Sequence, residues 1–97
     1  MRYFALVYHV TPDYLVRRAE FRAQHLDLAR EAHRRGDLLL GGAFTDPPDT
    51  ALLVWRCADS KPVEAFVAAD PYVANGLVAR HEIRDWKVVV ADQPMPL

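Results

Sequence analysis

Three short runs of apolar residues limit the folds open to this chain more than any other feature of its sequence. They lie at residues 4–8, 51–55 and 88–90, and each has the composition of a β-strand. A strand with one face in water alternates apolar and polar side chains, whereas these runs do not alternate. We therefore expect a sheet whose two faces are both covered.

Two helices can cover one face of such a sheet, so a second copy of the chain is the natural cover for the other face. A chain of 97 residues that is 52% hydrophobic also has little interior in which to hide apolar surface. The sequence therefore predicts a homodimer, or a higher multiple of it, with two sheets packed face to face. The alternative is a monomer with a large exposed apolar patch.

The succession of elements predicts an α+β fold within a single domain, residues 1–97. Strand and helix patterns follow in the order βαββαβ, which is the ferredoxin-like arrangement of an antiparallel sheet with both helices on one face. The expected strands are residues 2–10, 38–44, 51–57 and 80–91, and the expected helices are residues 13–35 and 60–69. A tail that contains proline, residues 92–97, is expected to follow.

Capping and breaking residues set the ends of the two helices. Thr11 is placed to cap the first helix, with Pro12 in its first turn, and Gly36 is placed to end it. Ser60 has the position of a cap for the second helix, and Pro71 interrupts that helix. The segment after residue 69 is therefore expected to leave helical geometry.

The charge balance argues against nucleic acid as a partner. Lys and Arg together number 12 and Asp and Glu number 13. The arginines of the first helix are interleaved with acidic residues, which is typical of a solvated helix face. No apolar stretch approaches the ~18 residues needed to cross a bilayer, so no membrane partner is expected. Cys57 is the only cysteine, which excludes an intrachain disulfide and favours a cytoplasmic location.

The first helix carries the residues that point most strongly to chemistry. At ~100° per residue, its apolar side is interrupted by three polar residues, Arg22, His25 and His33. Arg22 and His25 are three residues apart and project as neighbours. The apolar residues expected to face inward are Leu15, Ala19, Leu26 and Ala29, with Phe21, Leu28 and Ala32 extending the stripe.

Each of these polar residues also has a structural interpretation. Arg22 in an apolar sector needs a carboxylate, a ligand anion or water, but its long stem can also reach the surface or form a structural ion pair. His25 can be a core histidine bonded to a backbone carbonyl, and His33 is expected to be structural. No metal site is expected, because His25 and His33 are eight residues apart and not one turn apart. No glycine-rich phosphate loop is found, so no cofactor is expected.

Asp70 is the second candidate for chemistry. Pro71 turns the preceding Asp70 out of helical geometry, so that its carboxylate can reach another element. A carboxylate paired with a histidine fixes the imidazole tautomer and raises its basicity, as a general base requires. The alternative is a local hydrogen bond of Asp70 within its own turn.

These candidates lie in segments that resemble the YciI-like (YCII-related) family. The Arg-x-x-His of residues 22–25 and the Asp-Pro-Tyr of residues 70–72 occur in the family's order, and residues 36–42 and 83–86 resemble it as well. The resemblance spans nearly the whole chain. It implies a dimeric α/β barrel with a small-molecule site in which the helix histidine pairs with the aspartate before proline, here His25 and Asp70.

The resemblance also implies a class of reaction. It extends more distantly to muconolactone isomerase and to an enzyme that eliminates chloride from a chlorinated hydroxyquinone, both of which act on small oxygenated rings. By this likeness His25 is a general base, Asp70 orients it, and Arg22 or Tyr72 lies near a developing oxyanion. The alternative is a non-catalytic binding or accessory domain that recognises a small metabolite.

Overall fold

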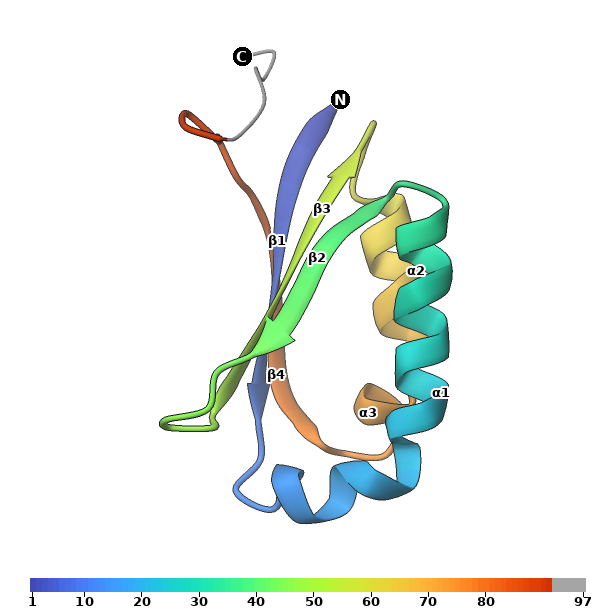
Figure 1. Ribbon diagram of the computed structural model, residues 1–97, viewed down its shortest axis with the longest axis vertical. Helices are drawn as coiled ribbons and strands as arrows, with labels where there is room; N and C mark the ends of the chain where they lie inside the picture. The colour runs from blue at the N-terminus through green and yellow to red at the C-terminus, as the bar shows by residue number, and fades with distance from the viewer. Residues whose placement is uncertain (92–97) are drawn as a thin grey trace.

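A four-stranded antiparallel sheet forms one layer of the structure, and the helices form a second layer against one of its faces (Figure 1). This computed structural model describes residues 1–91. The strand order β2-β3-β1-β4 confirms the predicted ferredoxin-like α+β fold. Along the chain the elements are β1 (Arg2–Val10), α1 (Tyr14–Arg34), β2 (Leu38–Ala43), β3 (Thr50–Cys57), α2 (Lys61–Ala69), α3 (Pro71–Ala74) and β4 (Val78–Asp85).

Strand β1 lies in the centre of the sheet and supplies much of the core. It pairs antiparallel with β3 on one side and with β4 on the other. Phe4, Leu6 and Tyr8 alternate along β1 and are each buried on the side of the helices. Their neighbours on β3 are buried on the same side, with Trp55 opposite Phe4 and Leu53 opposite Leu6. Every second residue of the apolar runs therefore faces the helices.

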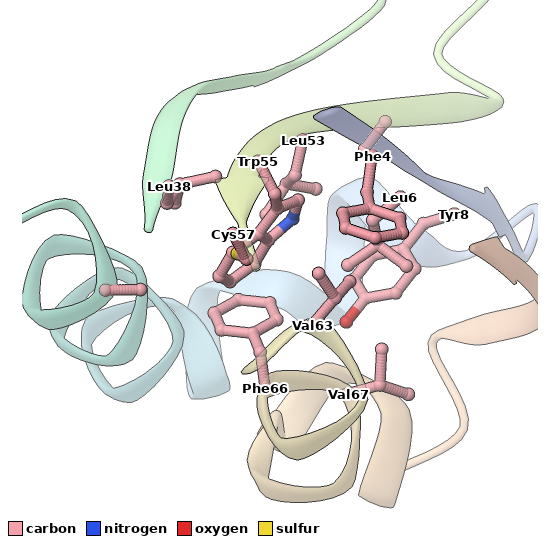
Figure 2. Close-up of a cluster of buried hydrophobic side chains, with 12 residues drawn as sticks. Phe4, Leu6, Tyr8, Leu38, Leu53, Trp55, Cys57, Val63, Phe66 and Val67 are labelled. Atoms are coloured by element: carbon pink, nitrogen blue, oxygen red, sulfur yellow. The ribbon is translucent and has the colours of Figure 1, made fainter. Parts of the chain in front are cut away.

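Helix α2 packs directly on this part of the sheet (Figure 2). Its buried residues Val63, Phe66 and Val67 have the i, i+3, i+4 spacing of one helix face. Phe66 packs edge-on against Trp55, with ring centroids 5.2 Å apart. The core therefore fixes α2 on the sheet, and with it the start of the segment that follows α2.

Two glycines in the left-handed conformation end helices. Gly36 after α1 has a φ of 86°, and Gly76 after α3 has a φ of 77°. In each case the glycine amide and the next amide donate to carbonyls in the last helical turn, which is the Schellman pattern. Gly36 therefore ends α1 as predicted, and Gly76 turns the chain from α3 into β4.

The last strand is shorter than predicted. The sequence pattern places a strand over residues 80–91, whereas β4 ends at Asp85 and the apolar run at residues 88–90 lies beyond it. The last pair of β4 joins Asp85 to Phe4, and one more hydrogen bond follows, from the Trp86 amide to the Tyr3 carbonyl. Beyond it the chain leaves β1, whose first residues continue to pair with β3. The two unalternating runs that belong to the sheet are those of β1 and β3. The predicted tail, residues 92–97, lies outside the described residues.

Helix α1 packs against the core through Phe21, Leu28, Ala29 and Ala32 as predicted, but the first turns of the helix differ from the prediction. Leu15 and Ala19 were expected to face inward, but both are exposed. Tyr14 is buried in their place because its ring packs edge-on against Tyr72, with centroids 5.7 Å apart. This contact sets the rotation of the helix. The inward side then consists of Tyr14, Phe21, Leu28, Ala29 and Ala32.

The two predicted side-chain caps do not form. The N-cap of α1 is Asp13, and the Thr11 hydroxyl donates to Asp13 Oδ1 at 2.6 Å. Ser60 does occupy the N-cap position of α2, but its hydroxyl donates to Glu64 Oε2 at 2.9 Å and accepts no backbone hydrogen bond.

Helix α1 has 21 residues, which is enough length to cross a bilayer. Charged residues occur along its whole length. None of the helices formed by residues 1–91 combines the length and the apolar character needed to span a membrane.

Candidate active site

Asp70 lies at the junction where the chain leaves α2 and enters α3. Its backbone is extended, with φ −71° and ψ 120°, because Pro71 disfavours helical geometry in the residue before it. Its side chain is fully buried, at 0% exposed. A buried carboxylate is costly unless donors surround it, so the donors around Asp70 define the site.

Donors from three elements meet at the Asp70 carboxylate. The Tyr72 backbone amide donates to Oδ1 at 3.0 Å, and the Tyr8 hydroxyl donates to Oδ2 at 2.8 Å. His25 Nδ1 lies 2.9 Å from Oδ1. Because a carboxylate accepts, the imidazole presents Nδ1–H to it and keeps Nε2 free. Asp70 therefore contacts His25 and also accepts a hydrogen bond within its own turn, from the Tyr72 amide, so both interactions considered for it from the sequence are present.

Aromatic neighbours hold the His25 ring from its other sides. The ring stacks on Tyr72, with centroids 4.0 Å apart and an angle of 12° between the planes. Phe66 of α2 approaches edge-on, with centroids 6.1 Å apart. The His25 side chain is 14% exposed and borders a cavity. The plane and direction of the imidazole are thus fixed by packing as well as by Asp70.

Burial raises the pKa of two tyrosines in this site, Tyr8 and Tyr72. It raises the pKa of Tyr8, and the Asp70 carboxylate raises that pKa further, by charge repulsion and by accepting the hydroxyl hydrogen bond. Burial also raises the pKa of Tyr72, an effect that Arg22 and Arg18 oppose only in part. Tyr8 and Tyr72 are therefore hydrogen-bond donors at neutral pH.

A cavity of about 450 Å³ lies between α1 and the strands β2 and β3. Its volume suits a small organic ligand. The polar lining lies mostly on the side of α1, which also contributes the apolar Leu26 and Ala29, and the lining from β2 and β3 is apolar. The polar lining includes Tyr8, Arg18, Arg22, His25, Arg30, His33 and Tyr72, and the apolar lining from the sheet includes Leu38, Leu39, Leu40 and Leu53.

The structure brings together three of the four residues selected from the sequence. His25, Asp70 and Tyr72 are in mutual contact. Arg22 is exposed, lines the same cavity and forms no ion pair or hydrogen bond with another of residues 1–91. His33 Nδ1 lies 2.8 Å from a backbone carbonyl of β2, as expected of a structural histidine. In this described part of the chain, no group of three His, Cys, Asp or Glu residues is arranged to hold a metal ion.

Tyr8 and Arg18 belong to the site but were not selected from the sequence. Tyr8 was read as part of the apolar run at residues 4–8. The available signal was its hydroxyl, because a buried tyrosine on a central strand needs a hydrogen-bond partner in the core. Arg18 lies one helical turn before Arg22, so helical spacing was the available signal. The wall from β2 carries no polar side chain, and only the tertiary fold reveals it.

Solved structures share this ferredoxin-like α+β fold. The 5-chloro-2-hydroxyhydroquinone dehydrochlorinase TftG from Burkholderia phenoliruptrix AC1100, in complex with 2,5-dihydroxybenzoquinone, aligns with a TM-score of 0.73 and 22% identity over 88% of this chain and 93% of its own. A provisionally named antibiotic biosynthesis monooxygenase from Deinococcus radiodurans has a TM-score of 0.56 and 15% identity, over 99% and 100% of the two chains. A second protein with the same provisional name, from Bacteroides thetaiotaomicron, has a TM-score of 0.57 and 17% identity, over 98% of this chain and 95% of its own. These likenesses establish the fold alone.

The family follows from the sequence match. The model of the YCII-related domain matches residues 1–87, so this chain belongs to the YCII-related family, as its motifs indicated. No curated protein matches the chain.

Removal of the Tyr8 hydroxyl tests the buried network. Tyr8→Phe leaves Asp70 Oδ2 without its donor in a fully buried position, so we expect the free energy of unfolding at neutral pH to fall by about 1–3 kcal/mol in urea denaturation. An unchanged free energy would contradict a role for this hydrogen bond.

The pH dependence of the free energy of unfolding should change as well in Tyr8→Phe. Because the pKa of Tyr8 is raised by folding, the unfolded state loses this proton first, and stability falls as pH rises above about 10. Tyr8→Phe should make that alkaline fall shallower.

Proposed function

We propose that this protein is an enzyme for a small molecule, in which His25 acts as a general base and Asp70 orients it. The observation that supports this role is the 2.9 Å contact between His25 Nδ1 and the buried Asp70 carboxylate, beside a cavity that the same imidazole lines. With Nδ1–H held by Asp70, the lone pair lies on Nε2. An imidazole oriented in this way can remove a proton from a ligand in the cavity.

The proposed reaction is abstraction of a proton beside a carbonyl, followed by elimination or isomerisation. Loss of the proton leaves an enolate, whose negative charge is stabilised by hydrogen-bond donors and cations. The Tyr72 hydroxyl, whose pKa is raised by burial, and the Arg22 guanidinium line the same cavity as His25. The enolate then either expels a leaving group from the neighbouring carbon or takes up a proton at another position.

The substrate class is a small oxygenated or cyclic metabolite. A cavity of about 450 Å³ with an apolar wall suits a ring of modest size. TftG, which shares the fold, is named as a dehydrochlorinase of a chlorinated hydroxyhydroquinone and is bound to a dihydroxybenzoquinone. A ring that can form an enol offers the acidic carbon that a histidine base requires.

A non-catalytic ligand-binding domain is the second candidate. The hydrogen bond of His25 with Asp70 and its stacking on Tyr72 could anchor a bound metabolite without any proton transfer. Exchange of carbon-bound protons separates the two functions, because only an active base replaces such a proton with one from solvent.

Exchange in heavy water is therefore the test of the proposed function. A panel of small enolisable acids, lactones and 2,5-dihydroxybenzoquinone is incubated with the protein and followed by proton NMR. We expect exchange, elimination or isomerisation of at least one compound, and a loss of roughly 10²–10⁴-fold in rate in His25→Gln. His81→Gln, the same change at an exposed histidine of β4, is the matched control and should keep the rate. Binding without any turnover across the panel would contradict the enzyme and support the binding domain.

We also propose that two copies pair through the open face of the sheet, and that the protein works in the cytoplasm. All helices lie on the other face (Figure 1). Ala5 and Val7 of β1 alternate with the core residues and pair with Val54 and Leu52 of β3, so they form an apolar centre on the open face. A second sheet packed face to face would bury this centre. The buried lone thiol of Cys57 suits a reducing compartment.

Sedimentation at micromolar concentration tests the pairing. We expect a dimer or a multiple of it, and we expect Leu52→Arg to give a monomer, because it places an unpaired charge in the proposed interface. Ala68→Arg adds the same charge at an exposed position of α2 and should leave the assembly unchanged. A clean monomer of the parent protein would overturn this proposal.

A further inference from the structure

The charged residues around the cavity all have one sign. Arg18, Arg22 and Arg30 line it from α1. None of the aspartates and glutamates among residues 1–91 contributes to the lining. The cavity is thus a concave site with several cations and no carboxylate on its surface, which favours an anion.

The acidic residues at and near α1 do not neutralise these cations. Glu31 pairs with Arg34, and Asp13 lies 3.9 Å from Arg17, and neither of these two arginines lines the cavity. Arg22 forms no ion pair or hydrogen bond within the described part of the chain. Its guanidinium group is therefore available to a ligand.

Arg18 and Arg22 lie at the same end of the cavity as His25. They are one helical turn apart, with a rise of about 6 Å between their backbones, so their side chains share a face. Both lower the pKa of Tyr72 against the larger effect of burial, so both guanidinium groups are within electrostatic range of its hydroxyl. Because Tyr72 stacks on His25, the two arginines and the imidazole gather around one aromatic ring.

The opposite wall of the cavity is apolar. Leu38, Leu39 and Leu40 of β2 and Leu53 of β3 form it. A ligand that fills the cavity therefore meets the cations of α1, together with Leu26 and Ala29, on one side and the leucine side chains of the sheet on the other. A small acid with an apolar ring has this distribution of charge.

We propose that Arg18 and Arg22 form an anion-binding subsite for the carboxylate of a small cyclic acid, whose ring lies against the leucine wall. The planar guanidinium fork matches the two oxygens of a carboxylate, and such charge-assisted pairs are stronger than neutral hydrogen bonds. The placement of the ring beside His25 rests on the proposed function. The anion subsite itself is a matter of binding and is tested without turnover.

Titration with benzoate and benzamide, followed by protein NMR at low ionic strength, tests the subsite. The two probes have the same ring and nearly the same shape, but only benzoate carries a negative charge. We expect benzoate to bind at least about tenfold more tightly than benzamide. Added salt should weaken the binding of benzoate and leave the binding of benzamide unchanged. Equal affinity for the two probes would overturn the proposal.

Substitutions on α1 assign the effect to particular arginines. Arg22→Gln and Arg18→Gln should each weaken benzoate binding by about tenfold and leave benzamide unchanged. Arg34→Gln removes the same charge from the same helix outside the cavity, and it should change benzoate binding less than about twofold. Equal losses in Arg34→Gln and Arg22→Gln would show a general charge effect and overturn the subsite.

The His25→Gln variant separates this proposal from the proposed function. It should retain the preference for benzoate, because the arginines carry the anion. If benzoate binds in an arginine-dependent way while no compound exchanges protons, the subsite stands and the catalytic role of His25 fails. If neutral compounds exchange protons and the protein binds benzoate no more tightly than benzamide, the catalytic role stands and the subsite fails.

Discussion

The Asp70 carboxylate, with no exposure to water, draws donors from β1, α1 and α3. A buried carboxylate that lacks such donors costs several kcal/mol, so the three elements are stable together only when their donors meet at this point. The core places the Tyr8 hydroxyl from one side, because Tyr8 alternates with Phe4 and Leu6 in the helix-facing row of β1. The core and the site therefore share Tyr8, which packs in one and donates to the Asp70 carboxylate in the other.

The orientation of His25 follows from this carboxylate. The Asp70 carboxylate accepts a hydrogen bond from Nδ1 of the imidazole, and the stacked Tyr72 ring fixes the imidazole plane. The imidazole itself borders the cavity between α1 and β2. The arginines that line the cavity are on α1, and four of its five lining leucines are on the sheet. An imidazole, a cationic end and an apolar wall thus meet in a volume suited to a small organic ligand. Membership in the YCII-related family agrees with this layout without specifying a reaction.

The features that could be predicted from the sequence depend on local geometry. The βαββαβ order follows from strand and helix patterns, and the effect of Pro71 on Asp70 is a constraint between neighbours. The features that could not be predicted depend on contacts between distant residues. The rotation of α1 is set by the packing of Tyr14 on Tyr72, and the end of β4 is set by its pairing with β1, which is distant in sequence. The role of Tyr8 in the site could not be predicted for the same reason, since its hydrogen-bond partner Asp70 lies 62 residues away in the sequence.

The tautomer of His25 is the most direct test of the central claim that Asp70 orients this imidazole toward the cavity. Nitrogen NMR of the histidine rings, at alkaline pH where imidazoles are neutral, distinguishes a hydrogen on Nδ1 from one on Nε2. The hydrogen should lie on Nδ1 of His25 in the parent protein, and Asp70→Asn should shift the population toward the Nε2–H form, because an asparagine side chain is a weaker acceptor and can also donate. A hydrogen on Nε2 in the parent, or no change in Asp70→Asn, would contradict the account.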